Sequence, residues 1–229
     1  MLTDVWPLFG LVLHTPRLEL RSPSPEQLAA LAELADEGVH DPATMPFLVP
    51  WTDLPPGPRG RSVVQHQWRQ WGALTPQRWT LNFAVLAGGE PVGIQDVGGT
   101  EFAVSREVHT GSWLGRRHQG RGIGTEMRAA VLHLAFAGLG ADWAVSSAAT
   151  DNPASIGVSR KLGYADDGTQ LEVVRGQRRT ELRFRLDRQT WAARQTVPVR
   201  IDGLEPCLEL LGAVNPAAAG ATASTGPGR

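Results

Sequence analysis

Three glycines, Gly120, Gly122 and Gly124, occupy alternate positions in the stretch HQGRGIGTEM, immediately before a helical pattern. Glycine allows left-handed backbone and close approach to a ligand. The first N–H groups of a helix have no internal partners, and the helix dipole favours negative charge at that end. The stretch therefore predicts an anion-binding loop at the start of a helix, with an ordinary turn as the alternative.

Two well-known phosphate loops do not fit this stretch. The P-loop needs a lysine directly after its last glycine, whereas the only lysine of the chain, Lys161, lies far downstream. The dinucleotide fingerprint needs a third glycine where Thr125 stands. The pattern QGRGIG, residues 119–124, therefore indicates an anion site of another kind.

The surrounding periodicity predicts a single α/β domain with a mixed sheet. Apolar residues alternate in the predicted strands, and they recur at helical spacing after Ser24 and after Gly124. The expected order is β–α–α–β–β–β–α–β–α–β–β. The predicted strands fall within 11–21, 80–87, 91–97, 109–114, 141–149 and on both sides of Gly176, and the predicted helices within 22–38, 61–74, 123–134 and 151–164.

A proline-rich segment, residues 39–60, separates the first two predicted helices. Six prolines exclude a helix or a central strand, and long ordered loops are often functional. Met45, Phe47 and Trp51 in this segment are therefore candidate substrate-binding residues. The alternative is a surface connection whose aromatic side chains simply cover the core.

Composition narrows the class of protein. The chain has 229 residues and a net charge of −1, so nothing favours bulk attraction to nucleic acid or to an anionic membrane. One cysteine, Cys207, cannot form an internal disulfide, and we see neither a signal peptide nor a membrane span, which favours a cytoplasmic protein. The histidines lack metal-ligand spacing, so we expect no metal.

The pattern QGRGIG resembles the acyl-CoA-binding signature of the GNAT superfamily of N-acyltransferases, Gln/Arg-x-x-Gly-x-Gly/Ala, at Gln119, Gly122 and Gly124. A second block, Asn152–Ser155 followed by Arg160–Tyr164, resembles members that acetylate ribosomal proteins. The resemblance covers about residues 11–188. More narrowly, the segments MPFLVPW and GTEMRAAVLHLAFA look like an actinobacterial subgroup that includes a succinyltransferase.

The resemblance implies a GNAT fold, in which a mixed, mostly antiparallel central sheet is splayed between its fourth and fifth strands and flanked by helices. It implies that the glycine loop holds the pyrophosphate of acyl-CoA and that the pantetheine arm pairs with the strand before it. The cofactor-binding residues that it implies are Ser112, Trp113, Leu114, Gln119, Gly120, Arg121, Gly122, Ile123, Gly124, Thr125, Asn152 and Ser155.

Acyl transfer from a thioester to an amine needs a deprotonated amine, a stabilised oxyanion and a thiolate leaving group. The resemblance places Ser155 near the CoA sulfur as the acid. It places Asp167 where some relatives carry a glutamate that acts as the base. Other candidates for the base are Glu101, Glu107, His109, Glu126 or a chain of water molecules.

The resulting interpretation is an enzyme that moves an acetyl or succinyl group from acyl-CoA to a primary amine by direct attack in a ternary complex. The alternative is an acyl-CoA sensor or a catalytically silent relative. We expect domain boundaries at 1–188 for the acyltransferase, 189–214 for an extension packed on it and 215–229 for a disordered tail. The many tryptophans also suggest a homodimer or higher homo-oligomer.

Overall fold

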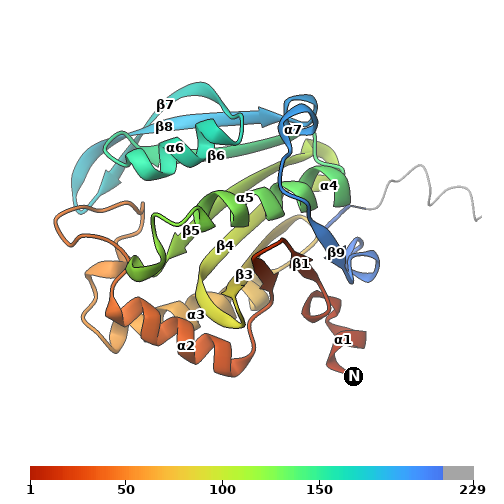
Figure 1. Ribbon diagram of the computed structural model, residues 1–229, viewed down its shortest axis with the longest axis horizontal. Coiled ribbons are helices and arrows are strands. Elements are labelled where there is room, and N and C mark those ends of the chain that lie inside the picture. Colours follow the sequence, from red (N-terminus) through yellow and green to blue (C-terminus); the bar gives the residue numbers. More distant parts are fainter. Residues whose placement is uncertain (214–229) are drawn as a thin grey trace, which may run out of the picture.

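The structure is a computed structural model that describes residues 1–213. Its centre is a nine-stranded sheet with the strand order β7-β8-β6-β5-β4-β3-β2-β1-β9 (Figure 1). The predicted tail at 215–229 lies outside the described residues. The strands are β1 (Val12–His14), β2 (Leu18–Arg21), β3 (Arg78–Ala87), β4 (Glu90–Thr100), β5 (Glu107–Leu114), β6 (Trp143–Ala149), β7 (Ala165–Val174), β8 (Gln177–Asp187) and β9 (Arg200–Asp202).

Helices cover both faces of this sheet. The larger core lies under α5 and α6, which run side by side in Figure 1, and a smaller core lies under α2 and α3 on the opposite face. We call these two sides the α5/α6 face and the α2/α3 face. The helices are α1 (Leu2–Val5), α2 (Pro25–Glu37), α3 (Pro58–Ala73), α4 (Phe102–Ser105), α5 (Ile123–His133), α6 (Pro153–Lys161) and α7 (Arg188–Arg194).

Local sequence signals account for most of these elements. Ser24 caps α2 by accepting a hydrogen bond from the backbone N–H of Gln27, whose side chain bonds back to Ser24, and Pro25 begins the helix. In β3, Leu81, Phe83 and Val85 alternate with residues of the other face. The short helices α1, α4 and α7 were not predicted, because four to seven residues carry little periodicity.

The sheet opens between β5 and β6, which are the fourth and fifth strands predicted from the sequence. They pair in parallel from Glu107↔Trp143 to His109↔Val145 and then separate. The other neighbouring strands among the described residues are antiparallel. The predicted mixed, mostly antiparallel α/β sheet is therefore confirmed, and its splay creates a gap that a ligand can enter.

The segment after β8 runs back across the domain. β9 pairs antiparallel with β1 at one edge of the sheet, and the buried residues Trp191, Cys207 and Leu211 join the larger core. Within residues 1–213, no helix combines the length and the apolar character that crossing a membrane requires.

Candidate active site

The glycine loop has the geometry of an anion cradle. Gly120 and Gly122 have φ values of 71° and 77°, which side chains rarely adopt, and Gly122 is the N-cap of α5. Gly124 differs, because its φ is ordinary and an added Cβ would lie 3.8 Å from Val158 and 3.9 Å from Leu114. The backbone therefore favours glycine at 120 and 122 but places no such demand on 124, which lines the cleft described below.

Side chains behind the loop fix its position. The amide of Gln119 donates hydrogen bonds to the carbonyl oxygens of Val39, at 2.6 Å, and Leu114, at 3.0 Å. Arg17 donates to Glu126 at 2.6 Å and to the carbonyl oxygen of Arg121 at 3.1 Å. Glu126 is 7% exposed and is held by this ion pair. These contacts join the loop to the end of β5, to the segment after α2 and to the residue before β2, and so hold it in place.

A cleft of about 1210 Å³ passes through the gap between β5 and β6. Gly120, Gly122 and Gly124 lie along it at one end, and residues of both sheet faces form its walls. Both faces contribute walls because alternate residues of a strand point to opposite faces of the sheet. Thr110 lies on the α5/α6 face with Val108, whereas Asp96 lies on the α2/α3 face with Ile94. One ligand can therefore enter from each face and the two can meet in the gap.

On the α5/α6 face, the start of α6 borders the cleft. The Asn152 side chain caps this helix by accepting a hydrogen bond from the N–H of Ser155 at 3.1 Å. That contact uses the oxygen of the amide and leaves its NH₂ group to donate to a ligand. Asn152 and Ser155 both line the cleft, and both are half-buried. They are therefore placed to contact a chain-like ligand that leaves the glycine loop.

On the α2/α3 face, aromatic rings form one wall of the cleft. Phe47 and Trp51 lie 5.3 Å apart, and Trp51 lies 5.7 Å from Trp113, between ring centroids. All three line the cleft together with Met45. Trp113 is therefore part of the wall built by the proline-rich loop, although its backbone belongs to β5.

Two arginines tie the proline-rich loop to the β7–β8 hairpin, which lies beside it at the left of Figure 1. Arg175 bonds the carboxylate of Asp53 through two nitrogens, one at 2.8 Å. Arg179 donates to the carbonyl oxygen of Met45 and lies 2.6 Å from the buried Glu181, which also lines the cleft. The loop therefore forms a fixed strap across the α2/α3 side of the cleft.

Asp96 is the carboxylate that projects into this side of the cleft. It faces Gly111 across the β4–β5 pair, and Oδ1 accepts a hydrogen bond from the Gly111 N–H at 2.5 Å. A Cβ at Gly111 would lie 2.6 Å from Oδ2, so only glycine leaves room for the carboxylate. Burial raises the pKa of Asp96, and His109, the Gly111 hydrogen bond, Arg128 and His66 partly oppose this.

Asp96 was missed by the sequence analysis. Its signal was present, because a charged residue two positions after Ile94 interrupts the apolar alternation of GIQDVGG. The nearby His66, on α3, also lines the cleft, and burial lowers its pKa. This face thus joins a half-buried carboxylate whose pKa is raised with an imidazole whose pKa is lowered, a combination suited to accepting and passing on protons.

The bases considered from sequence lie elsewhere. Asp167 is on β7, where Arg183 donates to it at 2.9 Å, and it does not line the cleft. Glu101 is the exposed N-cap of α4, and Glu126 is bound to Arg17. Asp96 lines the cleft, whereas none of these three carboxylates does.

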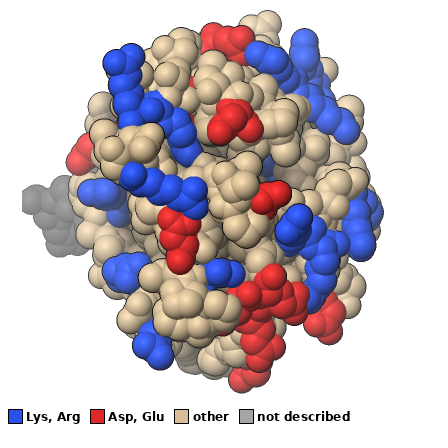
Figure 2. Space-filling model, turned by 90° about the vertical axis from the view of Figure 1, so that its left-hand side faces the viewer, with Lys and Arg blue, Asp and Glu red and all other residues tan. Residues whose placement is uncertain are grey.

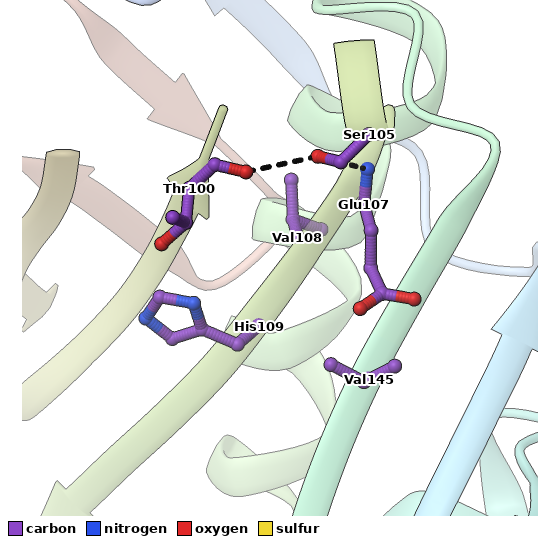
Figure 3. Close-up of a pocket in the computed structure, with 6 residues that line it drawn as sticks. All are labelled: Thr100, Ser105, Glu107, Val108, His109 and Val145. Atoms are coloured by element: carbon purple, nitrogen blue, oxygen red, sulfur yellow. Dashed lines mark hydrogen bonds between the residues drawn. The ribbon is translucent and has the colours of Figure 1, made fainter. Parts of the chain in front are cut away.

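Glu107 and His109 face a separate cavity of about 130 Å³ (Figure 3). The Glu107 side chain projects toward Val145, whereas the His109 ring projects away from Val145, toward β4. This cavity shares no lining residue with the large cleft. Glu107 is also paired with Arg185, so neither residue reaches a ligand in the gap directly.

Most of the residues singled out from the sequence meet in the large cleft. Arg121 is exposed beside it, Ile123 is buried in the larger core, and Asp167 is absent from its walls. The residues that do line it are Met45, Phe47, Trp51, Ser112, Trp113, Leu114, Gln119, Gly120, Gly122, Gly124, Thr125, Asn152 and Ser155.

Neither the surface charge nor Cys207 indicates a functional site that competes with the large cleft. Figure 2 shows basic and acidic side chains interspersed over one face, with neutral surface between them. Cys207 is fully buried, and burial raises its pKa to about 11, which makes the thiol unreactive. Among residues 1–213, no three His, Cys, Asp or Glu side chains are grouped to hold a metal ion.

Solved structures share this fold. One is RimL, a ribosomal L7/L12 alpha-N-protein acetyltransferase in complex with coenzyme A, with 19% identity, a TM-score of 0.60, and coverage of 76% of this chain and 95% of that one. Mycobacterium smegmatis RimJ in complex with CoA-disulfide has 18% identity, a TM-score of 0.60, and coverage of 82% and 97%.

A GCN5-related N-acetyltransferase from Brucella melitensis has 14% identity, a TM-score of 0.63, and coverage of 80% and 81%. The family model of the acetyltransferase (GNAT) domain matches residues 17–165, which is more than half of the chain. That span contains the splayed strands, the glycine loop and the Asn152 cap. The chain belongs to the GNAT acetyltransferase family.

Proposed function

We propose that this protein transfers an acyl group from acyl-CoA to a primary amine by direct attack in a ternary complex. The observation that carries the proposal is the cleft through the sheet, with the glycine loop at one end and Asp96 on the opposite face. Such a cleft allows two substrates to enter from different sides and react in the gap.

Acyl-CoA occupies the α5/α6 side in this proposal. The backbone N–H groups of Gln119–Thr125 and the N-terminus of α5 receive the pyrophosphate. The pantetheine arm passes Ser112 and Leu114 on β5, whose edge is free of β6 beyond His109, and it bonds the NH₂ group of Asn152. The thioester then lies in the gap, near Ser155.

The acceptor amine enters from the α2/α3 side, along Met45, Phe47 and Trp51. A lysine-like ammonium has a pKa of about 10.4 and must lose a proton before it attacks. Asp96 accepts that proton directly or through one water molecule. Its raised pKa makes it a stronger base than an exposed aspartate, and we assign it this role in preference to Asp167.

The remaining steps need an oxyanion site and an acid. Backbone N–H groups of β5 that face the gap stabilise the tetrahedral oxyanion. The hydroxyl of Ser155 donates a proton to the departing CoA thiolate. No covalent enzyme intermediate is required, and the buried, unreactive Cys207 takes no part.

Acetyl-CoA is the donor that the family membership favours, and succinyl-CoA is the second donor. Protein N-termini, protein lysines and small amines are the acceptor classes. We place the enzyme in the cytoplasm, where acyl-CoA is available. One comparison structure is named as a ribosomal-protein acetyltransferase, and another is named RimJ. A ribosomal-protein N-terminus is therefore the first acceptor to assay.

The test is release of CoA thiol, followed with a thiol-specific dye in the presence of an amine panel. Cys207 gives no background because it is fully buried. We expect turnover that depends on both substrates, with intersecting initial-rate patterns, and its loss in Asp96→Asn. Tight CoA binding without turnover on any amine, or acylation of the enzyme itself, would instead favour a sensor or a covalent mechanism.

A further inference from the structure

His109 is a titratable side chain that the proposed function leaves without a role. It projects from β5, is exposed, and lines the separate cavity of about 130 Å³, which we call the second cavity (Figure 3). His109↔Val145 is the last pair of β5 and β6, so His109 stands where the two strands separate. The next residues of β5, Thr110 and Gly111, already line the large cleft. His109 therefore lies at the boundary between the two cavities.

The strand register makes His109 a neighbour of Asp96. In the β4–β5 pair, Asp96 stands opposite Gly111, and Gly98, two residues further along β4, stands opposite His109. All four residues therefore belong to the same face of the sheet, with Asp96 and His109 on one diagonal. Residues on such a diagonal are close enough for long or aromatic side chains to interact.

Two glycines leave the space into which these side chains extend. A Cβ on Gly98 would lie 2.5 Å from Nε2 of His109, and a Cβ on Gly111 would lie 2.6 Å from Oδ2 of Asp96. The His109 ring thus covers Gly98 on β4, and the Asp96 carboxylate covers Gly111 on β5. A larger residue at either glycine would push one of the two groups aside.

Charge connects the same two groups. Burial raises the pKa of Asp96, and attraction to His109 is the largest of the effects that oppose this rise. The other charged side chains that face Asp96 are Arg128 on α5 and His66 on α3. Those two line the large cleft, whereas His109 lines the second cavity. His109 is therefore the neighbour of Asp96 that leads out of the cleft.

The second cavity offers a proton a path that bound substrates do not block. In the proposed reaction, acyl-CoA and the amine fill the gap while Asp96 takes a proton from the amine. Asp96 must lose this proton before the next turnover. Histidine side chains accept and release protons near neutral pH. Glu107 lines the same cavity but is paired with Arg185, so His109 is the group there that can carry the proton.

We propose that His109 carries the proton from Asp96 to solvent through the second cavity, so that the large cleft holds the substrates and the second cavity releases the proton. The proton moves from the Asp96 carboxyl, directly or through one water molecule, to a ring nitrogen of His109. The imidazolium then releases it to water or buffer, and both groups regain their starting charge. His109 touches neither substrate and acts through Asp96, and this inference rests on the proposed function.

The pKa of Asp96, measured by NMR of its carboxyl carbon in the full chain without ligand, tests the link between the two groups. Asp96→Asn identifies the signal. Because attraction to His109 opposes the effect of burial, His109→Gln should raise the pKa of Asp96 further. His14→Gln is the matched control, because His14 lies on β1 at 3.2 Å from Asp202, and it should leave the pKa of Asp96 unchanged. An unchanged pKa in His109→Gln would overturn the inference.

Rates with acetyl-CoA and the fastest amine of the panel test the proton path itself. His109→Ala should lower kcat about tenfold, less than the 10²–10⁴-fold loss typical of a group that exchanges a proton with the substrate. KM for both substrates should not change. Added imidazole should restore much of kcat, because it can occupy the space that the ring leaves in the second cavity. Imidazole should not restore Asp96→Asn, which lacks the first proton acceptor.

The outcomes separate this inference from the proposed function. If no amine of the panel is acylated, the proposed function fails, and the proton path with it. If amines are acylated but imidazole leaves the rate of His109→Ala unchanged, only the proton path is wrong. The same holds if His66→Gln lowers kcat and His109→Ala does not, because the proton then leaves through the large cleft.

Should His109→Ala not fold, His109→Gln takes its place in the rate measurement, because glutamine keeps a polar side chain at this exposed position. A lowered kcat with unchanged KM in that variant supports the proton path. A kcat equal to that of the wild type contradicts it.

Discussion

Replacement of Gly124 by valine should separate ligand binding from folding. Gly124 has an ordinary φ, lies in the first turn of α5 and borders the cleft. An added Cβ would be 3.8 Å from its nearest protein neighbour, which is normal van der Waals contact. The signature allows glycine or alanine at this position, so alanine should leave CoA binding intact, whereas the two methyl groups of valine extend into the space of a ligand seated on the loop.

Different effects on stability and affinity follow. Valine is favoured over glycine within a helix by about 0.3 kcal/mol, so the free energy of unfolding should stay equal or rise slightly. For a chain of this size, each kcal/mol changes Tm by about 2–4 °C, so Tm should stay within about 2 °C of the wild type. Methyl groups forced into a packed contact cost about 1–3 kcal/mol, so the affinity for CoA should fall about fivefold to a hundredfold.

Calorimetric titration with CoA and a thermal unfolding scan measure both quantities on the same sample. Gly120→Ala is the matched control, because no atom lies within 4 Å of its added Cβ but its φ of 71° disfavours alanine. That control should lower Tm, unlike Gly124→Val. Gly124→Ala is a second control, because the signature allows alanine there, and it should bind CoA as the wild type does. A Gly124→Val protein that binds CoA as tightly as the wild type would refute the assignment of the glycine loop.

Three further predictions concern the acceptor side. Asp96→Asn keeps an acceptor for the Gly111 N–H but removes the half-buried charge, so kcat/KM, measured by initial rates, should fall about 10²–10⁴-fold. The free energy of unfolding at neutral pH, measured by urea titration, should stay within about 1 kcal/mol of the wild type. Burial raises the pKa of Asp96, and the base must be ionised to accept a proton. On acidification, kcat/KM should therefore decline at a higher pH than an exposed aspartate would give. An identical pH profile in Asp96→Asn would contradict this. Trp51→Ala should raise KM for the acceptor amine while the Kd for CoA is unchanged, because the ring lies on the α2/α3 face against Trp113.

The glycine-loop end of the cleft could be predicted because its signals are local. Gly120 and Gly122 sit at positive φ directly before a helix, and Asn152 caps the next one, so a few consecutive residues determine each geometry. The alternation in β3 and the capping box of α2 similarly fix elements within one segment. These features do not depend on contacts with distant parts of the chain.

Other parts of the cleft depend on contacts between distant segments. Asp96 faces the cleft because β4 pairs with β5 in a register that places Gly111 opposite it, and no short motif reveals that register. Arg128 lies in an apolar helical pattern, and only the splay of β5 from β6 exposes it to the cleft. Asp167 was chosen by analogy to relatives, but the β7–β8 hairpin pairs it with Arg183 instead.

Trp113 illustrates the same difference within one strand. It was grouped with Ser112 and Leu114 as a cofactor-binding residue because the resemblance places the pantetheine arm along the backbone of this strand. Strand alternation turns its ring to the opposite face, where it meets Trp51. Which neighbour packs on each face is a tertiary property, so spacing alone could not assign it.

Amide hydrogen exchange with and without acyl-CoA tests the central claim, that the cofactor occupies one face of the gap and leaves the other to the amine. The account predicts that acyl-CoA protects the amides of 119–125 and 112–114, and that the amides of α3 near His66 exchange at unchanged rates. Protection confined to α3 and the proline-rich loop, with unchanged exchange in the glycine loop, would contradict it.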